Sequence, residues 1–284
     1  MKILITGANG QLARVLPKAL LGHDASALTH AQLDITKLNL VRDALDWHKP
    51  DAVINAAAYT DVDGAEAEPE NAYRVNALGA RNLALATGEA DLPLLHVSTD
   101  YVFDGLGKRP LHEFDPVNPQ SVYGRSKLAG EQQVALFNPR HYIARTAWLY
   151  SPPVNGEGKN FPLTMLAQAA KPGVEHVRVV NDQFGSPTYA PHLALAIAQL
   201  IQTDAYGTYH LAGQGSASWY ELTNELYYRS TITLPVYPVK SEEYPRPAKR
   251  PKYAVLTTLQ DPQILLPPWE EGLAEFVWLM RRKG

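Results

Sequence analysis

Cysteine is absent from the 284 residues of the sequence. Its absence excludes a disulfide framework, a thiolate nucleophile and a zinc–thiolate site. No stretch of about 18 consecutive apolar residues occurs, so a membrane-spanning helix is not expected. An excess of either charge is also missing, because 26 Lys and Arg stand against 29 Asp and Glu, for a formal net charge of −3. This balance predicts no nucleic-acid partner.

Metal-ligand spacings such as HExxH do not occur among the nine histidines, so no metal is expected. The N-terminal apolar run in MKILITGANG is too short for the hydrophobic part of a signal peptide. Because no membrane span is expected either, we predict a cytoplasmic protein. Hydrophobic residues make up 45% of the chain, which is enough to bury a sizeable core in one large or two modest domains.

The first half of the chain alternates short apolar runs with helical patterns. The apolar runs lie at residues 3–6, 52–55, 94–98 and 142–146, and the helical patterns at 11–21, 65–87 and 119–137. Short, uninterrupted apolar runs separated by helices are typical of parallel strands buried on both faces. The sequence therefore predicts an α/β fold with a doubly wound parallel sheet of the Rossmann type, which binds ligands at the carboxyl ends of its strands.

The second half is less regular. We predict a dinucleotide-binding domain over residues 1–150 and a mainly substrate-binding domain, smaller than the first, over 151–284. The chain is expected to re-enter the sheet within 175–212, with 176–180 and 208–211 as candidate late strands. Residues 151–160 are rich in Gly, Pro and Asn, which is typical of a loop.

A glycine-rich turn follows the first apolar run. Residues 6–13 (TGANGQLA) match G-x-x-G-x-x-A between a predicted strand and a predicted helix. Gly7 suits a tight turn, Gly10 allows close approach of a pyrophosphate, and the start of the helix offers free N–H groups. An ordinary glycine turn is the alternative, but this context favours a dinucleotide site.

Tyr123 and Lys127 are four residues apart in a helical pattern whose start we expect at Asn118-Pro119. A nearby ammonium lowers the pKa of a phenol, which is ordinarily about 10, and so tunes a proton donor. YxxxK is common by chance, and a surface pair is the alternative. However, Thr99 follows the strand at 94–98, where substrates bind in such folds. Thr99 is expected to hydrogen-bond a substrate carbonyl, Tyr123 to protonate it, and Lys127 to hold a nicotinamide ribose.

Several longer motifs carry a resemblance. ITGANGQLA, NAAAYTDVDGAEAEPE, VSTDYVFDG, VYGRSKLAGE, RTAWLY, NDQFGSPTYA and LPPWEEGL together resemble the extended short-chain dehydrogenase/reductases over almost the full length. The resemblance implies Thr99, Tyr123 and Lys127 as the catalytic residues. It also implies NADPH-dependent reduction of the C4 ketone of dTDP-4-dehydro-L-rhamnose to dTDP-L-rhamnose.

The expected binding residues combine the glycine turn with this resemblance. The expected cofactor-binding residues are Gly7, Asn9, Gly10, Gln11, Leu12, Thr29, Asp34, Ile35, Ala56, Ala57, Ala58, Tyr59, Tyr123 and Lys127. The expected substrate-binding residues are Thr99, Asp100, Tyr101, Trp148 and Gln183. Small residues at 56–58 and an aromatic at Trp148 are equally well explained by packing alone. We interpret residues 240–252 as a solvated proline-rich loop, with Arg250 as a lesser candidate for contacting the substrate's diphosphate.

Two other functions stay open. One is an epimerase or dehydratase for another nucleotide sugar, although Tyr101 stands where a dehydratase would use a second acid. The other is a non-catalytic regulatory subunit that resembles the β subunit of methionine adenosyltransferase. The intact set of Thr99, Tyr123 and Lys127 favours an enzyme over the regulatory subunit.

The cofactor preference and the oligomeric state are predicted from charges. The second strand is expected at 25–28 and ends at Thr29-His30, without the acid that binds the ribose hydroxyls of NAD. With Arg14 also in reach, we predict NADPH as the preferred cofactor, with NADH tolerated. The helix at 11–21 has no acid, so we expect a monomer or a weak, metal-independent dimer.

Overall fold

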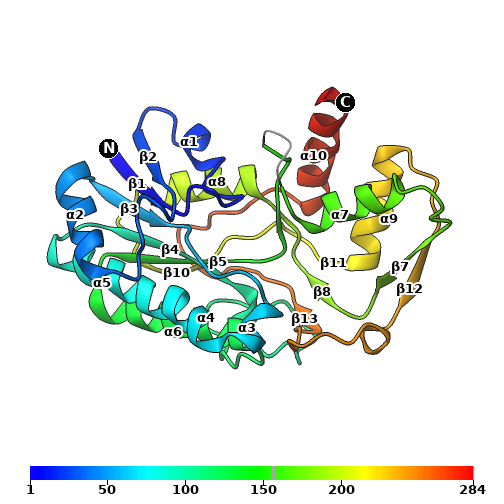
Figure 1. Cartoon of the computed structure of the whole chain (residues 1–284), viewed down its shortest axis with the longest axis horizontal. Coiled ribbons are helices and arrows are strands. Elements are labelled where there is room, and N and C mark those ends of the chain that lie inside the picture. The colour runs from blue at the N-terminus through cyan, green and yellow to red at the C-terminus, as the bar shows by residue number, and fades with distance from the viewer. Residues whose placement is uncertain (155–157, 284) are drawn as a thin grey trace.

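Six parallel strands form the central sheet, in the order β10-β5-β4-β3-β1-β2 (Figure 1). The structure is a computed structural model that describes residues 1–154 and 158–283. Three residues of the loop predicted at 151–160, numbers 155–157, lie outside the described residues. The strands are β1 Lys2–Thr6, β2 Asp24–Leu28, β3 Ala52–Asn55, β4 Leu94–Thr99, β5 His141–Thr146 and β10 Gly207–His210. The predicted doubly wound parallel sheet is confirmed.

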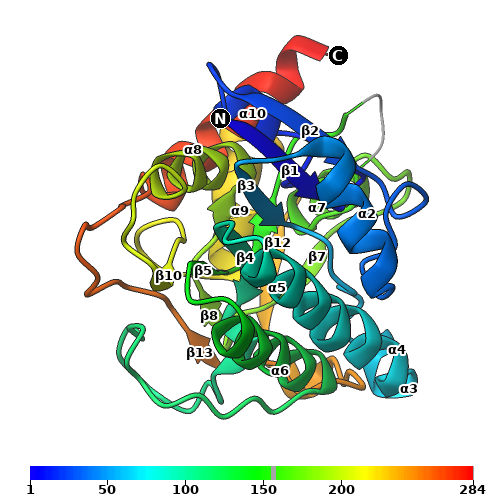
Figure 2. The same ribbon diagram turned by 90° about the vertical axis from the view of Figure 1, so that its left-hand side faces the viewer.

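Helices cover both faces of this sheet, as Figures 1 and 2 show from two sides. On one face, α1 (Leu16–Ala19) and α8 (Ala190–Leu200) pack on the sheet in one apolar cluster. On the other lie α2 (Leu38–His48), α5 (Ala80–Glu89) and α6 (Val122–Phe137). Because the strands are covered on both sides, Ile3, Leu4 and Ile5 of β1 are each at most 1% exposed. Such uninterrupted burial explains the apolar runs of the sequence.

Of the two candidate late strands, one joins the sheet and one does not. β10 pairs with β5 at the sheet edge, in the region predicted at 208–211. The expectation for 176–180 was wrong, because β7 (Val177–Val180) pairs with β12 (Val236–Val239) in a separate two-stranded sheet. In β7 the buried side chains of Val177 and Val179 flank the exposed Arg178. This one-sided burial suits a sheet covered on one face only.

The remaining C-terminal elements lie together at the other end of the molecule (Figure 1). They are α7 (Phe161–Ala169), α9 (Trp219–Ser230), α10 (Trp269–Lys283), the short strands β6 (Leu149–Tyr150), β8 (Phe184–Gly185), β9 (Thr188–Tyr189), β11 (Ala217–Ser218) and β13 (Tyr253–Ala254), and the 3₁₀ turn η3 (Ser241–Glu243). Residues of α7, α9, α10, β6, β9 and β11 share a second apolar core. The domain boundary near residue 150 stays a prediction. Within the described part of the chain, no helix is both long and apolar enough to cross a membrane.

The helices differ from the predicted ones in their ends and continuity. The pattern at 11–21 forms turns and then only the short helix α1. The pattern at 65–87 is divided into α3 (Gly64–Ala67), α4 (Pro69–Tyr73), the π-helix η1 (Arg74–Gly79) and α5. Pro69 begins α4 because it has no N–H to continue α3. Helix α6 starts three residues later than predicted, since the side chain of Ser121, not Asn118, accepts the N-cap hydrogen bond, from the Gly124 N–H at 3.1 Å.

Candidate active site

The glycine turn lies flush against the end of β3. Gly7 has a φ of +77°, and a Cβ placed there would lie 2.8 Å from the Cα and the N of Ala57. The Gly10 N–H donates to the Gly7 carbonyl at 2.8 Å, which closes the turn. Only glycine at position 7 is compatible with this backbone, which brings the turn close to the carboxyl end of β3. The residues present therefore fit the pyrophosphate of a dinucleotide.

Gln11, expected at the cofactor, bonds the opposite half of the chain through its side-chain oxygen. Its Oε1 accepts from the Ser151 hydroxyl at 3.2 Å and from the Asn160 side chain at 2.8 Å. Leu12 is buried in the core under the sheet face, 4% exposed. Its side chain contributes to packing, so any contact with a cofactor is made by its backbone. Asn9 is exposed at the tip of the turn.

The end of β2 carries the residues that were expected to read the cofactor's ribose. Thr29 donates to the Gln32 side chain from both its N–H and its hydroxyl, each at 2.9 Å. The exposed His30 lies with its Nε2 3.9 Å from Asp34 Oδ1. Ile35 is buried against α2 and α5. The acid nearest the end of β2 is thus adjacent to a histidine that can carry positive charge.

Asn76 organises the loop after β3, and sequence reasoning missed it. Its Oδ1 accepts from the Tyr59 N–H at 2.9 Å, and its Nδ2 donates to the Tyr59 carbonyl at 3.1 Å. The same Nδ2 donates to Ser126 on α6 at 2.9 Å. Asn76 lies on the π-helix η1, whose extra residue per turn is not visible in an apolar pattern. It therefore joins the loop at 56–59 to the helix that carries Tyr123.

Thr99 and Tyr123 come together at the carboxyl end of β4. Thr99 is the last residue of β4, and its hydroxyl donates to Asp100 Oδ1 at 3.1 Å. Tyr123 lies in the first turn of α6, and its ring meets that of Tyr101 edge to face at 5.5 Å. Burial raises the pKa of Tyr123 to about 12, although a hydrogen bond with Thr99 opposes the shift. A neutral phenol is thus held beside a hydroxyl, as a proton donor requires.

Asp100 is buried in the same place. It is 2% exposed, and its Oδ2 has no hydrogen-bond partner among the described residues. Burial raises the pKa of Asp100 to about 7, against the hydrogen bond from Thr99. A buried oxygen with no partner at a strand end is ready to accept a ligand's hydroxyl group.

Lys127 does not point where the YxxxK spacing suggested. It is 2% exposed, and its Nζ donates to the Val97 carbonyl at 2.6 Å and lies 3.2 Å from His96 Nε2. Burial lowers the pKa of Lys127 to about 8, and the charge of Glu131 only partly offsets it. The expected lowering of the Tyr123 pKa by Lys127 is thus not found in this arrangement. The lysine is turned toward the sheet, where its Nζ contacts β4.

Trp148 and Gln183 lie in the C-terminal part, and both contact Trp219. Trp148 has a φ of +46° and stacks on Trp219 with 3.4 Å between ring centroids. The Trp219 Nε1–H donates to Gln183 Oε1 at 3.3 Å. A Cβ on Gly185 would lie 2.4 Å from the Trp148 ring, so glycine there makes room for the indole. The rare backbone conformation of Trp148 marks a side chain whose direction is set by its surroundings.

A cationic groove is lined in part by the segment between β12 and β13, which is the mostly exposed loop that the sequence predicted. The groove holds about 330 Å³ and is lined by Asp104, Leu106, Gln120, Gln183, Ser241, Tyr244, Arg246, Ala248, Lys249, Arg250 and Lys252. Arg250 forms a bidentate ion pair with Asp63, at 2.8 and 3.0 Å, across the two halves of the chain. Burial raises the pKa of Tyr101, and the charge of the nearby Arg250 opposes that shift. The groove therefore begins close to the two tyrosines.

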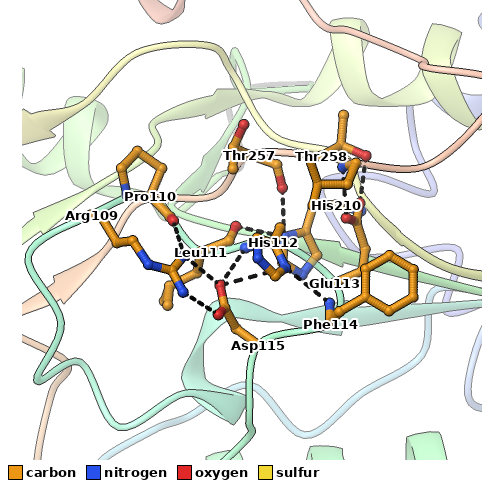
Figure 3. Close-up of polar contacts among 11 residues, drawn as sticks. Arg109, Pro110, Leu111, His112, Glu113, Phe114, Asp115, His210, Thr257 and Thr258 are labelled. Carbon is orange, nitrogen blue, oxygen red and sulfur yellow. Dashed lines mark hydrogen bonds and ion pairs between the residues drawn. The ribbon is translucent and has the colours of Figure 1, made fainter.

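The segment between Thr99 and α6 is anchored to the far edge of the sheet (Figure 3). Glu113 accepts from the His210 N–H at the end of β10 at 2.9 Å and from the Thr258 hydroxyl at 2.5 Å. Within the segment, Arg109 pairs with Asp115 and holds the pKa of that carboxyl at about 2. These contacts hold the long connection in place, so that its two ends can present Thr99 and Tyr123 to the same space.

The chain as a whole is similar to known proteins. Residues 1–282 match the family described as the RmlD substrate binding domain. The chain belongs to this family. A dTDP-4-dehydrorhamnose reductase from Mycolicibacterium smegmatis is 42% identical over 285 residues, covering 97% of this chain and 85% of the relative. The resemblance drawn from the motifs is thereby confirmed.

Two solved structures of the family share the whole fold. A dTDP-4-dehydrorhamnose reductase from Clostridium acetobutylicum has a TM-score of 0.94 at 43% identity, covering 99% of this chain and 100% of that one. Another, from Bacillus anthracis and in complex with NADP, has a TM-score of 0.93 at 39% identity, covering 98% and 99% of the two chains. The match over the full length includes the C-terminal elements that carry the cationic groove.

Proposed function

We propose that the protein is an NADPH-dependent reductase that converts the C4 ketone of dTDP-4-dehydro-L-rhamnose into the hydroxyl of dTDP-L-rhamnose. The observation that carries this proposal is the meeting of the Thr99 and Tyr123 hydroxyls at the carboxyl end of β4, in the sheet whose strand β1 leads into the Gly7 turn. Relatives that match almost the full chain bear the name of this reductase, which supports the same activity. Since NADPH and nucleotide sugars are cytoplasmic metabolites, the proposal also predicts a cytoplasmic location.

The residues have distinct roles in this reaction. Gly7 and Gly10 let the backbone approach the pyrophosphate, and the bound nicotinamide supplies the hydride. When substrate binds, the Thr99 hydroxyl turns its proton from Asp100 Oδ1 to the substrate's C4 oxygen, and Tyr123 Oη gives that oxygen its proton as negative charge develops. Lys127 would hold the nicotinamide ribose only if its Nζ, which now contacts the Val97 carbonyl and His96, turned toward the bound cofactor. The raised pKa of Tyr123 keeps the phenol protonated before the reaction, as an acid must be.

The cationic groove suits the nucleotide half of the substrate. Arg246, Lys249 and Lys252 supply positive charge for a diphosphate, and Tyr244 offers a ring on which a base can stack. Arg250 is already paired with Asp63, so we assign it to joining the two halves of the chain and only secondarily to the phosphates. We assign Trp148 and Gln183, of which Gln183 lines the groove, to the sugar of the substrate. The specific nucleotide is part of this proposal.

The activity is tested by mixing the purified protein with NADPH and dTDP-4-dehydro-L-rhamnose and following the loss of NADPH absorbance. Tyr123→Phe is expected to lower kcat by about 100- to 10,000-fold with little change in NADPH affinity, because the phenol acts mainly in the transition state. Tyr228→Phe, at an exposed tyrosine of α9, is the matched control and should leave kcat unchanged. A Tyr123→Phe variant with near wild-type kcat contradicts the proposed role of Tyr123. No NADPH oxidation by the wild type contradicts the function itself.

A further inference from the structure

A chain of buried polar side chains runs through the sheet from the glycine turn to Lys127. Thr6 Oγ1 donates to Asn55 Oδ1 at 2.7 Å, and Asn55 Nδ2 lies 2.9 Å from His96 Nδ1. His96 Nε2 in turn lies 3.2 Å from Lys127 Nζ. The side chains come from β1, β3, β4 and α6, and each residue is at most 2% exposed. No water competes at this depth, so the direction of each hydrogen bond is set by its neighbours.

One backbone donor fixes which atom donates and which accepts in each of these hydrogen bonds. The backbone N–H of Ala57 donates to Asn55 Oδ1 at 3.2 Å, and a backbone N–H cannot accept. The amide oxygen of Asn55 therefore faces Thr6 and Ala57, and its Nδ2, a donor, faces His96. His96 Nδ1 must accept this bond. Burial holds the pKa of His96 well below its usual range, so the ring is neutral and, with Nδ1 accepting, carries its one proton on Nε2.

The proton on Nε2 has a consequence for Lys127. The Nε2–H points at Lys127 Nζ across 3.2 Å and needs an acceptor there. A neutral amine has a lone pair to accept it and can still donate to the Val97 carbonyl at 2.6 Å, whereas an ammonium has none. An ammonium would set two N–H groups against each other in a buried site.

The nearest carboxylate does not stabilise an ammonium on Lys127 enough to offset this repulsion. Glu131, one turn along α6, is the acid whose charge acts on Lys127. Its two oxygens are held by Arg145 of β5, at 2.9 and 2.7 Å, with both side chains less than 10% exposed. The charge of Glu131 is therefore shared with a cation that is buried beside it. Tyr123 and Asp100, the other titratable groups at this end of α6, are held by their contacts with Thr99.

We propose that His96 is a positioning residue for the reductase reaction: held by Asn55 as the Nε2–H tautomer, it donates to Lys127 and opposes protonation of the lysine. This inference rests on the proposed function in giving Lys127 a part in catalysis. Toward the glycine turn, the hydrogen-bond chain passes through Asn55, whose Oδ1 also accepts from the Ala57 N–H beside Gly7. The hydrogen-bond state of the glycine-turn region and the charge of Lys127 are thus coupled through one imidazole.

The first test reads the tautomer directly, in the protein without substrate or cofactor. Histidines are labelled with ¹⁵N, and the His96 signals are assigned by their loss in His96→Gln. At a pH above the titration of Lys127, we expect the Nε2–H tautomer, with an unprotonated Nδ1. The Nδ1–H tautomer in the wild type would overturn the proposal. Because no turnover is measured, this outcome does not depend on whether the reductase activity is found.

The second test uses an isosteric substitution to reverse the direction of the hydrogen bonds between residue 55, His96 and Lys127. In Asn55→Asp, one carboxylate oxygen can keep Thr6 and Ala57 while the other faces His96 Nδ1 as an acceptor. The ring is then expected to carry a proton on Nδ1, and the midpoint of the Lys127 titration, followed by the ¹³Cε signal assigned with Lys127→Met, is expected to rise by at least about one pH unit. The basic limb of kcat/KM against pH should move the same way. His112→Gln, a histidine outside this chain of contacts, is the control and should move neither. A reversed tautomer with an unmoved Lys127 midpoint would refute the coupling.

Discussion

Lys127 should destabilise the fold at neutral pH, and replacing it with Met should reveal this. The pKa of Lys127 is lowered by burial from 10.5 to about 8. Below pH 8 the lysine is charged in both the folded and the unfolded chain, and the folded protein bears the whole cost of a buried charge. Between pH 8 and 10.5 the unfolded chain binds a proton that the folded protein has released, so the free energy of unfolding rises with pH. Each pH unit is worth about 1.4 kcal/mol, and the full cost is about 3 kcal/mol.

Urea unfolding at pH 7 and at pH 9.5 measures this effect. From pH 7 to 9.5, the wild type is expected to gain about 2 kcal/mol in free energy of unfolding relative to Lys127→Met. The comparison across pH is needed because Met also leaves the Val97 carbonyl and the His96 N–H without a partner, at a cost that does not change with the charge of Lys127. Lys171→Met, at an exposed lysine, should follow the wild type. If the difference between the wild type and Lys127→Met is the same at both pH values, Lys127 is not held with a lowered pKa and the reasoning is wrong.

Three further predictions concern the cofactor and assembly. Gly7→Ala should weaken NADPH binding by at least about tenfold in a calorimetric titration, because the new Cβ would meet the Ala57 backbone at 2.8 Å and strain a φ of +77°; unchanged affinity would remove the turn from the cofactor site. NADPH should give a higher kcat/KM than NADH, and His30→Asp should reverse the ratio by placing a carboxylate where the 2′-phosphate is expected; a wild type that prefers NADH contradicts our assignment of the β2 end. Sedimentation should find a monomer or a weak dimer that is insensitive to chelator, since α1 has no acid, and a dimer that a chelator dissociates would refute this.

Much of the fold and part of the site could be predicted from the sequence because their signals are local. Strands buried on both faces leave apolar runs, and β1, β3, β4 and β5 lie where those runs stand. The glycines of the turn and the spacing of Tyr123 and Lys127 are likewise contained in a few consecutive residues. Thr99 could be found because hydroxyls at strand ends meet ligands in any doubly wound sheet.

The direction of Lys127 was decided by the tertiary structure alone. Its partner His96 is 31 residues away, and the proton on His96 depends in turn on Asn55, which is 41 residues further back. Asn76 and the groove around Arg246 were missed for the same reason, since a π-helical turn and the pairing of Arg250 with Asp63, 187 residues apart, leave no periodic pattern. The sequence by itself determined which chemical groups are available and on which elements they lie. Only the packing of β1, β3, β4 and α6 decided which donor faces which acceptor, because in a buried site that choice depends on neighbours distant in the chain.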